Sequence, residues 1–147
     1  SKVFDLGERK IRVSAYETAH TDNDVTITDI KTGTLWAGDL LFIDRTPTID
    51  GDIHGFIDVL AQLISLENIN LVIPGHGPPT KNWQKAFKKV KNYFVILRDD
   101  IRNSISEDQG LREAMETVAR SESKKWLLFD VQNARNINQV YPKLEWE

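Results

Sequence analysis

The chain has 147 residues, a formal net charge of −3 and no cysteine. This length fits a single domain, which could bury roughly two-thirds of the surface of its unfolded chain. The acidic balance and the pI of about 5.6 argue against a nucleic-acid-binding surface, and the lack of cysteine excludes disulfides and thiolate metal sites. No apolar run is long enough to span a bilayer. The chain starts at Ser1 without a methionine, so we expect a processed product or a fragment.

The first half of the chain is predicted to be mainly strands, because apolar and polar residues alternate. The expected strands cover residues 3–6, 10–16, 25–30 and 34–37. A long loop from Asp39 to Asp52 follows, then a helix over 53–66 and a short buried strand over 70–73.

The second half is predicted to be helical. Residues 81–104 carry apolar side chains at steps of three and four, which gives one apolar face. The lysines of this segment lie mostly off that face and indicate a solvated helix surface rather than an anion site. Further helices are expected over 108–120 and 131–144, and Pro142 should kink or restart the last one. The alternation of strands and helices indicates an α/β fold.

Three polar side chains follow predicted strands and could converge at one edge of the sheet. They are His20 in the loop Ala-His-Thr-Asp-Asn-Asp, Asp39 in Trp-Ala-Gly-Asp, and His76 in Pro-Gly-His-Gly-Pro. Imidazole and carboxylate are the usual nitrogen and oxygen ligands of zinc. The three residues are therefore our candidate metal ligands.

Each candidate also has a simpler interpretation. Taken singly, His20 and His76 are as readily explained as polar loop residues, although the glycines and prolines around His76 would hold its ring with little entropy to lose. Asp39 could cap a turn. His54, at the start of a helix, is expected to be structural or solvent-facing, since no carboxylate has matching spacing.

The loop around His20 contains two further carboxylates, Asp22 and Asp24. Their simplest role is to form the turn. We also expect that they could accept hydrogen bonds from the His20 ring and so orient it.

In order, these segments resemble the second half of a metallo-β-lactamase superfamily domain, an αββα sandwich with metal ligands on strand-end loops. His20, Asp39 and His76 match the third, fourth and fifth metal motifs of that family. The tail Asn133–Tyr141 and its Lys-Leu-Glu continuation further resemble the zinc metallohydrolases of quinoprotein relay systems, a branch associated with the periplasm. The resemblance implies that residues 1–147 form the C-terminal half of such a domain.

The family's His-x-His-x-Asp-His motif does not occur in this sequence. In an intact site, the resemblance implies one or two zinc ions. His20 would hold one ion and His76 the other, and the remaining ligands of both ions would come from the missing motif. Asp39 would bridge the two ions or fix the nucleophile. In this chain alone, zinc binding is expected to be weak or absent.

Two functions remain open at this point. The first is a zinc-dependent hydrolase, in which water activated by zinc attacks an ester, lactam or thioester-like small-molecule substrate, with this chain as its C-terminal part. The second is a non-catalytic half-domain or interaction module without a complete metal site. A metal measurement on the purified chain, together with its intact mass, separates them.

The resemblance also implies an uncovered sheet face. We expect this face to be lined by residues such as Ile11, Val13, Val25, Ile27 and Leu35, with both long helices on the opposite side. A bare apolar face and an open strand edge favour association. The expected partner is the missing N-terminal half or a second copy of the chain.

Overall fold

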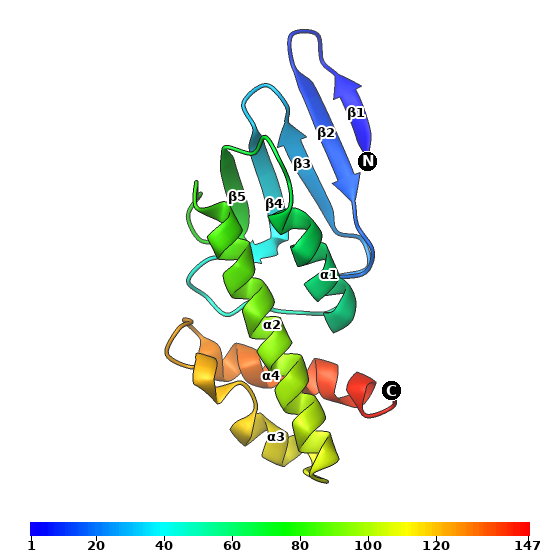
Figure 1. The fold of residues 1–147 in the computed structure, drawn as a ribbon, viewed down its shortest axis with the longest axis vertical. Coiled ribbons are helices and arrows are strands. Elements are labelled where there is room, and N and C mark those ends of the chain that lie inside the picture. Colours follow the sequence, from blue (N-terminus) through cyan, green and yellow to red (C-terminus); the bar gives the residue numbers. More distant parts are fainter.

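A computed structural model describes all 147 residues (Figure 1). Five strands and four α-helices follow one another along the chain, with one short 3₁₀ helix, η1. The elements are β1 (Lys2–Asp5), β2 (Lys10–Ala15), β3 (Val25–Asp29), β4 (Thr34–Phe42), α1 (Ile53–Ile64), β5 (Leu71–His76), α2 (Trp83–Ser106), α3 (Leu111–Thr117), η1 (Arg120–Glu122) and α4 (Phe129–Leu144). This confirms the predicted α/β class.

The strands form one mixed sheet in the order β1-β2-β3-β4-β5. The first four strands are antiparallel neighbours; short turns join β1 to β2 and β3 to β4, and a longer loop over residues 16–24 joins β2 to β3. β5 pairs parallel to β4, and α1 provides the crossover that a parallel pair requires. The ends of β4 and β5 therefore lie side by side at the same edge of the sheet.

Helices α1 and α2 cover one face of the sheet (Figure 1). Leu35 of β4 and Val72 of β5 are fully buried beneath them, together with the aromatic rings of Phe56, Phe87 and Phe94. Asp52 caps α1 by accepting a hydrogen bond from the Gly55 backbone N–H at 2.8 Å. Helices α3 and α4 lie at the far end of α2 from β1 and β2.

The opposite face of the sheet has no helix over it. Val25, Ile27 and Trp36 are 48%, 40% and 41% exposed there, and Ile27 and Trp36 are direct cross-strand neighbours. Ile11 and Val13, which pair with β3 on the same face, are only half-buried. The predicted uncovered face is therefore present, but Leu35 was wrongly assigned to it. Leu35 pairs with Val72 and faces the helices.

The sequence-based boundaries are wrong at the two strand ends that carry candidate ligands. β4 extends to Phe42 rather than ending at residue 37, so Asp39 lies inside a strand. β5 extends to His76, so this histidine is the last strand residue rather than a loop residue. The β4–β5 register shifts on both sides of Gly38, whose φ is +54°. Such an irregularity re-aims side chains and lets Asp39 project from the sheet edge.

The helices differ less from expectation. α1 and α2 are close to their predicted ranges, whereas α3 is shorter than predicted. α4 begins at Phe129 and continues through Pro142 to Leu144 without restarting. Pro142 lies in the last turn, so the helix loses one N–H donor there and ends two residues later. No helix is both long and apolar enough to cross a membrane.

Candidate functional site

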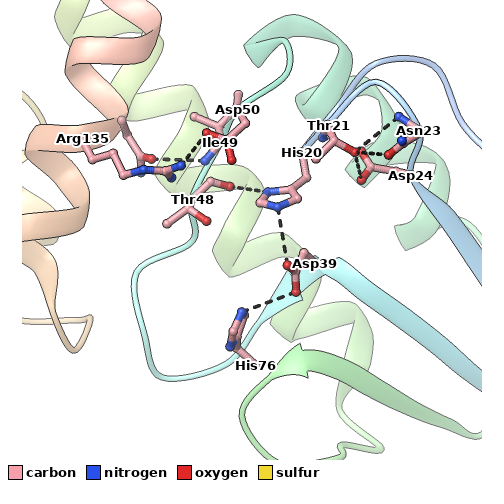
Figure 2. Close-up of polar contacts among 11 residues, drawn as sticks. His20, Thr21, Asn23, Asp24, Asp39, Thr48, Ile49, Asp50, His76 and Arg135 are labelled. Atoms are coloured by element: carbon pink, nitrogen blue, oxygen red, sulfur yellow. Dashed lines mark hydrogen bonds and ion pairs between the residues drawn. The ribbon is translucent and has the colours of Figure 1, made fainter.

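Three side chains predicted from the sequence come together at the end of β4 and β5 (Figure 2). The Asp39 carboxylate lies between the two imidazoles. Its Oδ2 is 3.5 Å from Nε2 of His20, and its Oδ1 is 3.5 Å from Nε2 of His76. One carboxylate thus faces two nitrogen donors, one with each oxygen.

The His20 ring is held from behind by a backbone carbonyl. Its Nδ1 is 2.8 Å from the Thr48 carbonyl oxygen. A carbonyl only accepts, so Nδ1 must carry the proton, and in the neutral ring Nε2 then presents a lone pair toward Asp39. The backbone of His20 is anchored as well, because its own carbonyl accepts from the Asp50 and Gly51 N–H groups at 2.9 and 2.8 Å.

The expectation that Asp22 or Asp24 orients the His20 ring is wrong. Asp24 accepts from the Thr21 backbone N–H and hydroxyl, both at 2.9 Å, and so shapes the turn. No hydrogen bond or ion pair joins Asp22 to the ring, whose Nδ1 faces the Thr48 carbonyl and whose Nε2 faces Asp39. The turn interpretation of these carboxylates holds for Asp24.

Phe42, which sequence reasoning missed, packs against both histidines. Its ring stacks on His76 with centroids 4.9 Å apart and lies 5.8 Å from the ring of His20. Its backbone pairs with His76 across the parallel ladder, and Ile43 N–H donates to the His76 carbonyl at 2.9 Å. The apolar residues Leu-Leu-Phe directly after Asp39 were its only signal in the sequence. Phe42 fixes the ring plane of His76 and closes one wall of the site.

Gly75 brings β5 into close contact with the Asp39 segment. A Cβ atom at this position would lie 2.0 Å from Oδ1 of Asp39 and 2.7 Å from the carbonyl carbon of Gly38. Only a residue without a side chain allows the two backbones to approach this closely.

A cavity of about 400 Å³ opens in front of the three side chains. Its opposite wall comes from the loop after β4 and from the first turns of α4, where Leu128, Gln132 and Arg135 recur at helical spacing. Arg135 pairs with Asp50 at the rim, whereas Arg45 lines the cavity without a carboxylate partner. A small molecule could therefore reach the histidines from a mostly polar cleft.

His54 is not part of this group. Its Nε2 hydrogen-bonds Oε1 of Glu147 at 2.7 Å, which ties the start of α1 to the C-terminus. The hydrogen bond from Arg102 and the one from His54 hold the pKa of the Glu147 carboxyl below its usual value. This confirms the structural interpretation of His54.

The three convergent side chains do not by themselves form a metal-binding group. No set of three or more histidine, aspartate or glutamate side chains in the chain is arranged to hold one metal ion. The reason is visible in Figure 2: the two imidazoles approach different oxygens of Asp39, so each metal position would have one nitrogen and a shared carboxylate. Zinc sites normally have three or four protein ligands.

Comparisons with known proteins identify the fold of the chain. No family model matches the sequence, and no curated protein matches it. Among solved structures, a metallo-β-lactamase family protein from Thermus thermophilus matches with a TM-score of 0.61 and 17% identity, over 71% of this chain and 36% of that one.

Two further solved structures cover nearly the whole chain. A β-lactamase domain protein from Burkholderia ambifaria matches with a TM-score of 0.68 and 14% identity, over 94% of this chain and 44% of that one. A stereoselective inverting sec-alkylsulfatase from a Pseudomonas species matches with a TM-score of 0.78 and 12% identity, over 97% of this chain and 25% of that one.

The chain thus has the fold of the metallo-β-lactamase superfamily, as its sequence motifs suggested. It spans less than half the length of each of these solved structures.

Proposed function

We propose that this chain is the C-terminal part of a zinc-dependent hydrolase of the metallo-β-lactamase fold. The observation that supports it most directly is the carboxylate of Asp39 between Nε2 of His20 and Nε2 of His76, at the mouth of the cavity. The substrate class is a small molecule with an ester, lactam or thioester-like carbonyl.

The donor chemistry of the site fits a divalent cation. Nδ1 of His20 donates its proton in a hydrogen bond to the Thr48 carbonyl, so Nε2 of the neutral ring directs its lone pair at a carboxylate oxygen of Asp39. Two acceptors facing each other repel unless a proton or a cation lies between them. Imidazole and carboxylate together suit zinc better than calcium or magnesium, which prefer oxygen ligands.

The residues of this chain would divide the work as follows. His20 and His76 would each hold one cation position, and Asp39 would bridge the two or fix the nucleophilic water. When bound, zinc would supply the Lewis acidity that makes water a nucleophile near neutral pH. Phe42 keeps the ring of His76 stacked, and the cavity wall formed by Gln132 and Arg45 would orient the substrate.

Loss of a single histidine tests the metal assignment. We expect His76→Ala to abolish saturable zinc binding, because only one histidine and Asp39 then remain, fewer than the three or four protein ligands that zinc sites normally have. His54→Ala should leave binding unchanged, since that ring bonds Glu147 instead. Isothermal titration of the purified chain with zinc measures both.

Binding by the unmodified chain should itself be weak, because no closed group of ligands exists within it. Equilibrium dialysis that found two tightly held zinc ions per chain would contradict this expectation. Equal loss of binding in the His54 and His76 variants would contradict the ligand assignment.

A non-catalytic half-domain is the second candidate function. The observation that favours it is that the residues of this chain alone form no complete metal-binding group. Metal content measured together with intact mass separates the two: a sample whose mass shows the missing N-terminal half bound to this chain, and which still holds no metal and gives no turnover, supports the module. The narrower resemblance to quinoprotein relay hydrolases, and a periplasmic location with it, stays a prediction.

The uncovered sheet face provides the second test of the proposal. Val25, Ile27 and Trp36 form an exposed apolar surface, and such surfaces often mark protein–protein interfaces. We propose that the N-terminal half of the domain covers this face when it is present, and that a second copy of the chain covers it when that half is absent. The chain alone should therefore self-associate at micromolar concentration.

Sedimentation velocity measures this association. Ile27→Lys should shift the chain toward monomer, since it places a charge at the centre of the exposed face. Val131→Lys is the matched control, because Val131 is 70% exposed but lies on α4, away from the sheet. A stable monomer of the unmodified chain would show that the face needs no cover.

A further inference from the structure

Two asparagines of α4 are buried as deeply as the aromatic core. Asn133 is 1% exposed and Asn136 is 0% exposed. Both belong to the tail motif Asn133–Tyr141, to which the proposed function assigns no role. Buried amides are costly unless every polar atom has a partner, and no buried side-chain nitrogen or oxygen of the chain lacks one.

The side-chain amide of Asn136 hydrogen-bonds to the loop between β4 and α1. Its Nδ2 donates to the Pro47 carbonyl at 2.7 Å, and its Oδ1 accepts from the Ile49 N–H at 3.2 Å. These two backbone groups flank Thr48 on both sides. The Thr48 carbonyl is the one that accepts from Nδ1 of His20 at 2.8 Å.

Tyr93 of α2 completes the network. Its hydroxyl accepts from Nδ2 of Asn136 at 2.9 Å and donates to Oδ1 of Asn133 at 2.9 Å. Burial raises the pKa of Tyr93 well above its usual value, so the hydroxyl keeps its proton. The amide of Asn136 is therefore fixed in orientation from α2 as well as from the loop.

We propose that Asn136 is a positioning residue for the candidate ligand His20. By clamping the Pro47–Ile49 backbone, it directs the Thr48 carbonyl at Nδ1 and so holds the ring in the tautomer whose Nε2 is free for a cation. That His20 is a metal ligand rests on the proposed function, whereas the tautomer of its ring is a property of this chain alone. Partners that orient a metal-ligating histidine in this way typically change metal affinity when they are lost.

Asn133 provides a matched comparison within the same helix. It is equally buried and shares the Tyr93 hydroxyl, but its Nδ2 donates to the Val118 carbonyl at 3.0 Å rather than to the loop. Loss of Asn133 should therefore destabilise the fold to a similar degree without releasing Thr48. A purely structural role for Asn136 would make the two variants alike.

The experiment compares Asn136→Ala with Asn133→Ala in the metal-free chain. Nitrogen chemical shifts of the histidine rings, recorded well above their pKa range, report the tautomer of His20 directly. We expect one Nδ1-protonated form in the unmodified chain and in Asn133→Ala. In Asn136→Ala we expect a mixture dominated by the Nε2-protonated form that solvated imidazole prefers.

A cobalt titration of the same samples measures the consequence for a cation. The affinity of Asn136→Ala should fall about tenfold relative to Asn133→Ala, which is within the range known for such orienting partners. Unchanged tautomer in Asn136→Ala, or an equal change in both variants, would overturn the proposal. If the tautomer changes in Asn136→Ala but the unmodified chain binds no cobalt, the result supports the positioning of the ring and contradicts the proposed metal site.

Hydrogen exchange of the unmodified chain keeps the proposal testable if Asn136→Ala does not fold. The Ile49 amide should exchange as slowly as amides in the middle of α4, because its acceptor is a fully buried side chain. Exchange at the rate of exposed loop amides would show that Asn136 does not hold the loop, and would overturn the proposal.

Discussion

Replacement of Gly75 by alanine is expected to destabilise the fold by about 3 kcal/mol, at the upper end of the cost of overpacking a core. The added methyl would lie 2.0 Å from the Asp39 carboxylate and 2.7 Å from the backbone of Gly38. The carboxylate could rotate away, but the Gly38 backbone is fixed by its pairing with Pro74 of β5. Strands β4 and β5 would have to separate, and Asp39 would leave its place between the two histidines.

Urea unfolding and cobalt titration of the same sample measure both effects. Gly110→Ala is the control, because a Cβ there meets only the end of a Glu113 side chain at 3.9 Å. That change should cost about 1 kcal/mol or less, the usual loss at a helix N-cap. A Gly75→Ala chain with unaltered stability and cobalt affinity would show that the sheet edge yields more easily than the structure implies.

Hydrolysis is expected to be negligible for this chain alone and to appear when an N-terminal segment with the His-x-His-x-Asp-His motif is supplied. The chain contributes only three candidate ligands, and they form no closed metal-binding group. The added segment would complete both cation positions and cover the exposed sheet face. We expect turnover to rise by at least about a thousandfold, a modest share of typical enzymatic acceleration.

The assay uses an activated ester, a lactam and a thioester, the substrate classes of the proposed function. His76→Ala in this chain should prevent the recovery even when the two segments associate, whereas His54→Ala should not. Chelator-sensitive turnover by a sample whose mass equals this sequence alone would refute the prediction. Association without turnover for any substrate would favour the non-catalytic module.

The sequence by itself determined the class of fold and the identity of the convergent residues. Alternating apolar residues predicted β2 and β3, and apolar stripes predicted α1 and α2, because these patterns reflect local geometry. His20, Asp39 and His76 were identifiable because few residue types bind metals and each stood near a strand end. That the three side chains approach one another was an expectation that the structure confirmed.

Other features depended on contacts between distant parts of the chain. The length of β4 and the side of the sheet on which Leu35 lies follow from its pairing with β5, which no local pattern reveals. Likewise, the sequence offered Asp22 and Asp24 as possible hydrogen-bond partners of the His20 ring, besides their simpler role in the turn. The actual partner, Thr48, is a backbone carbonyl, which any residue type could supply.

The buried asparagines show most clearly that contacts between distant parts of the chain cannot be predicted from a local sequence pattern. Asn136 contacts Pro47 and Ile49 across nearly ninety positions of sequence, and polar residues in a helix usually face solvent. Only the packing of α4 against α2 and the loop removes water from these amides and leaves the backbone as their partner. Residue type and periodicity thus determine which groups are available for chemistry, whereas tertiary packing decides which of them are oriented for it.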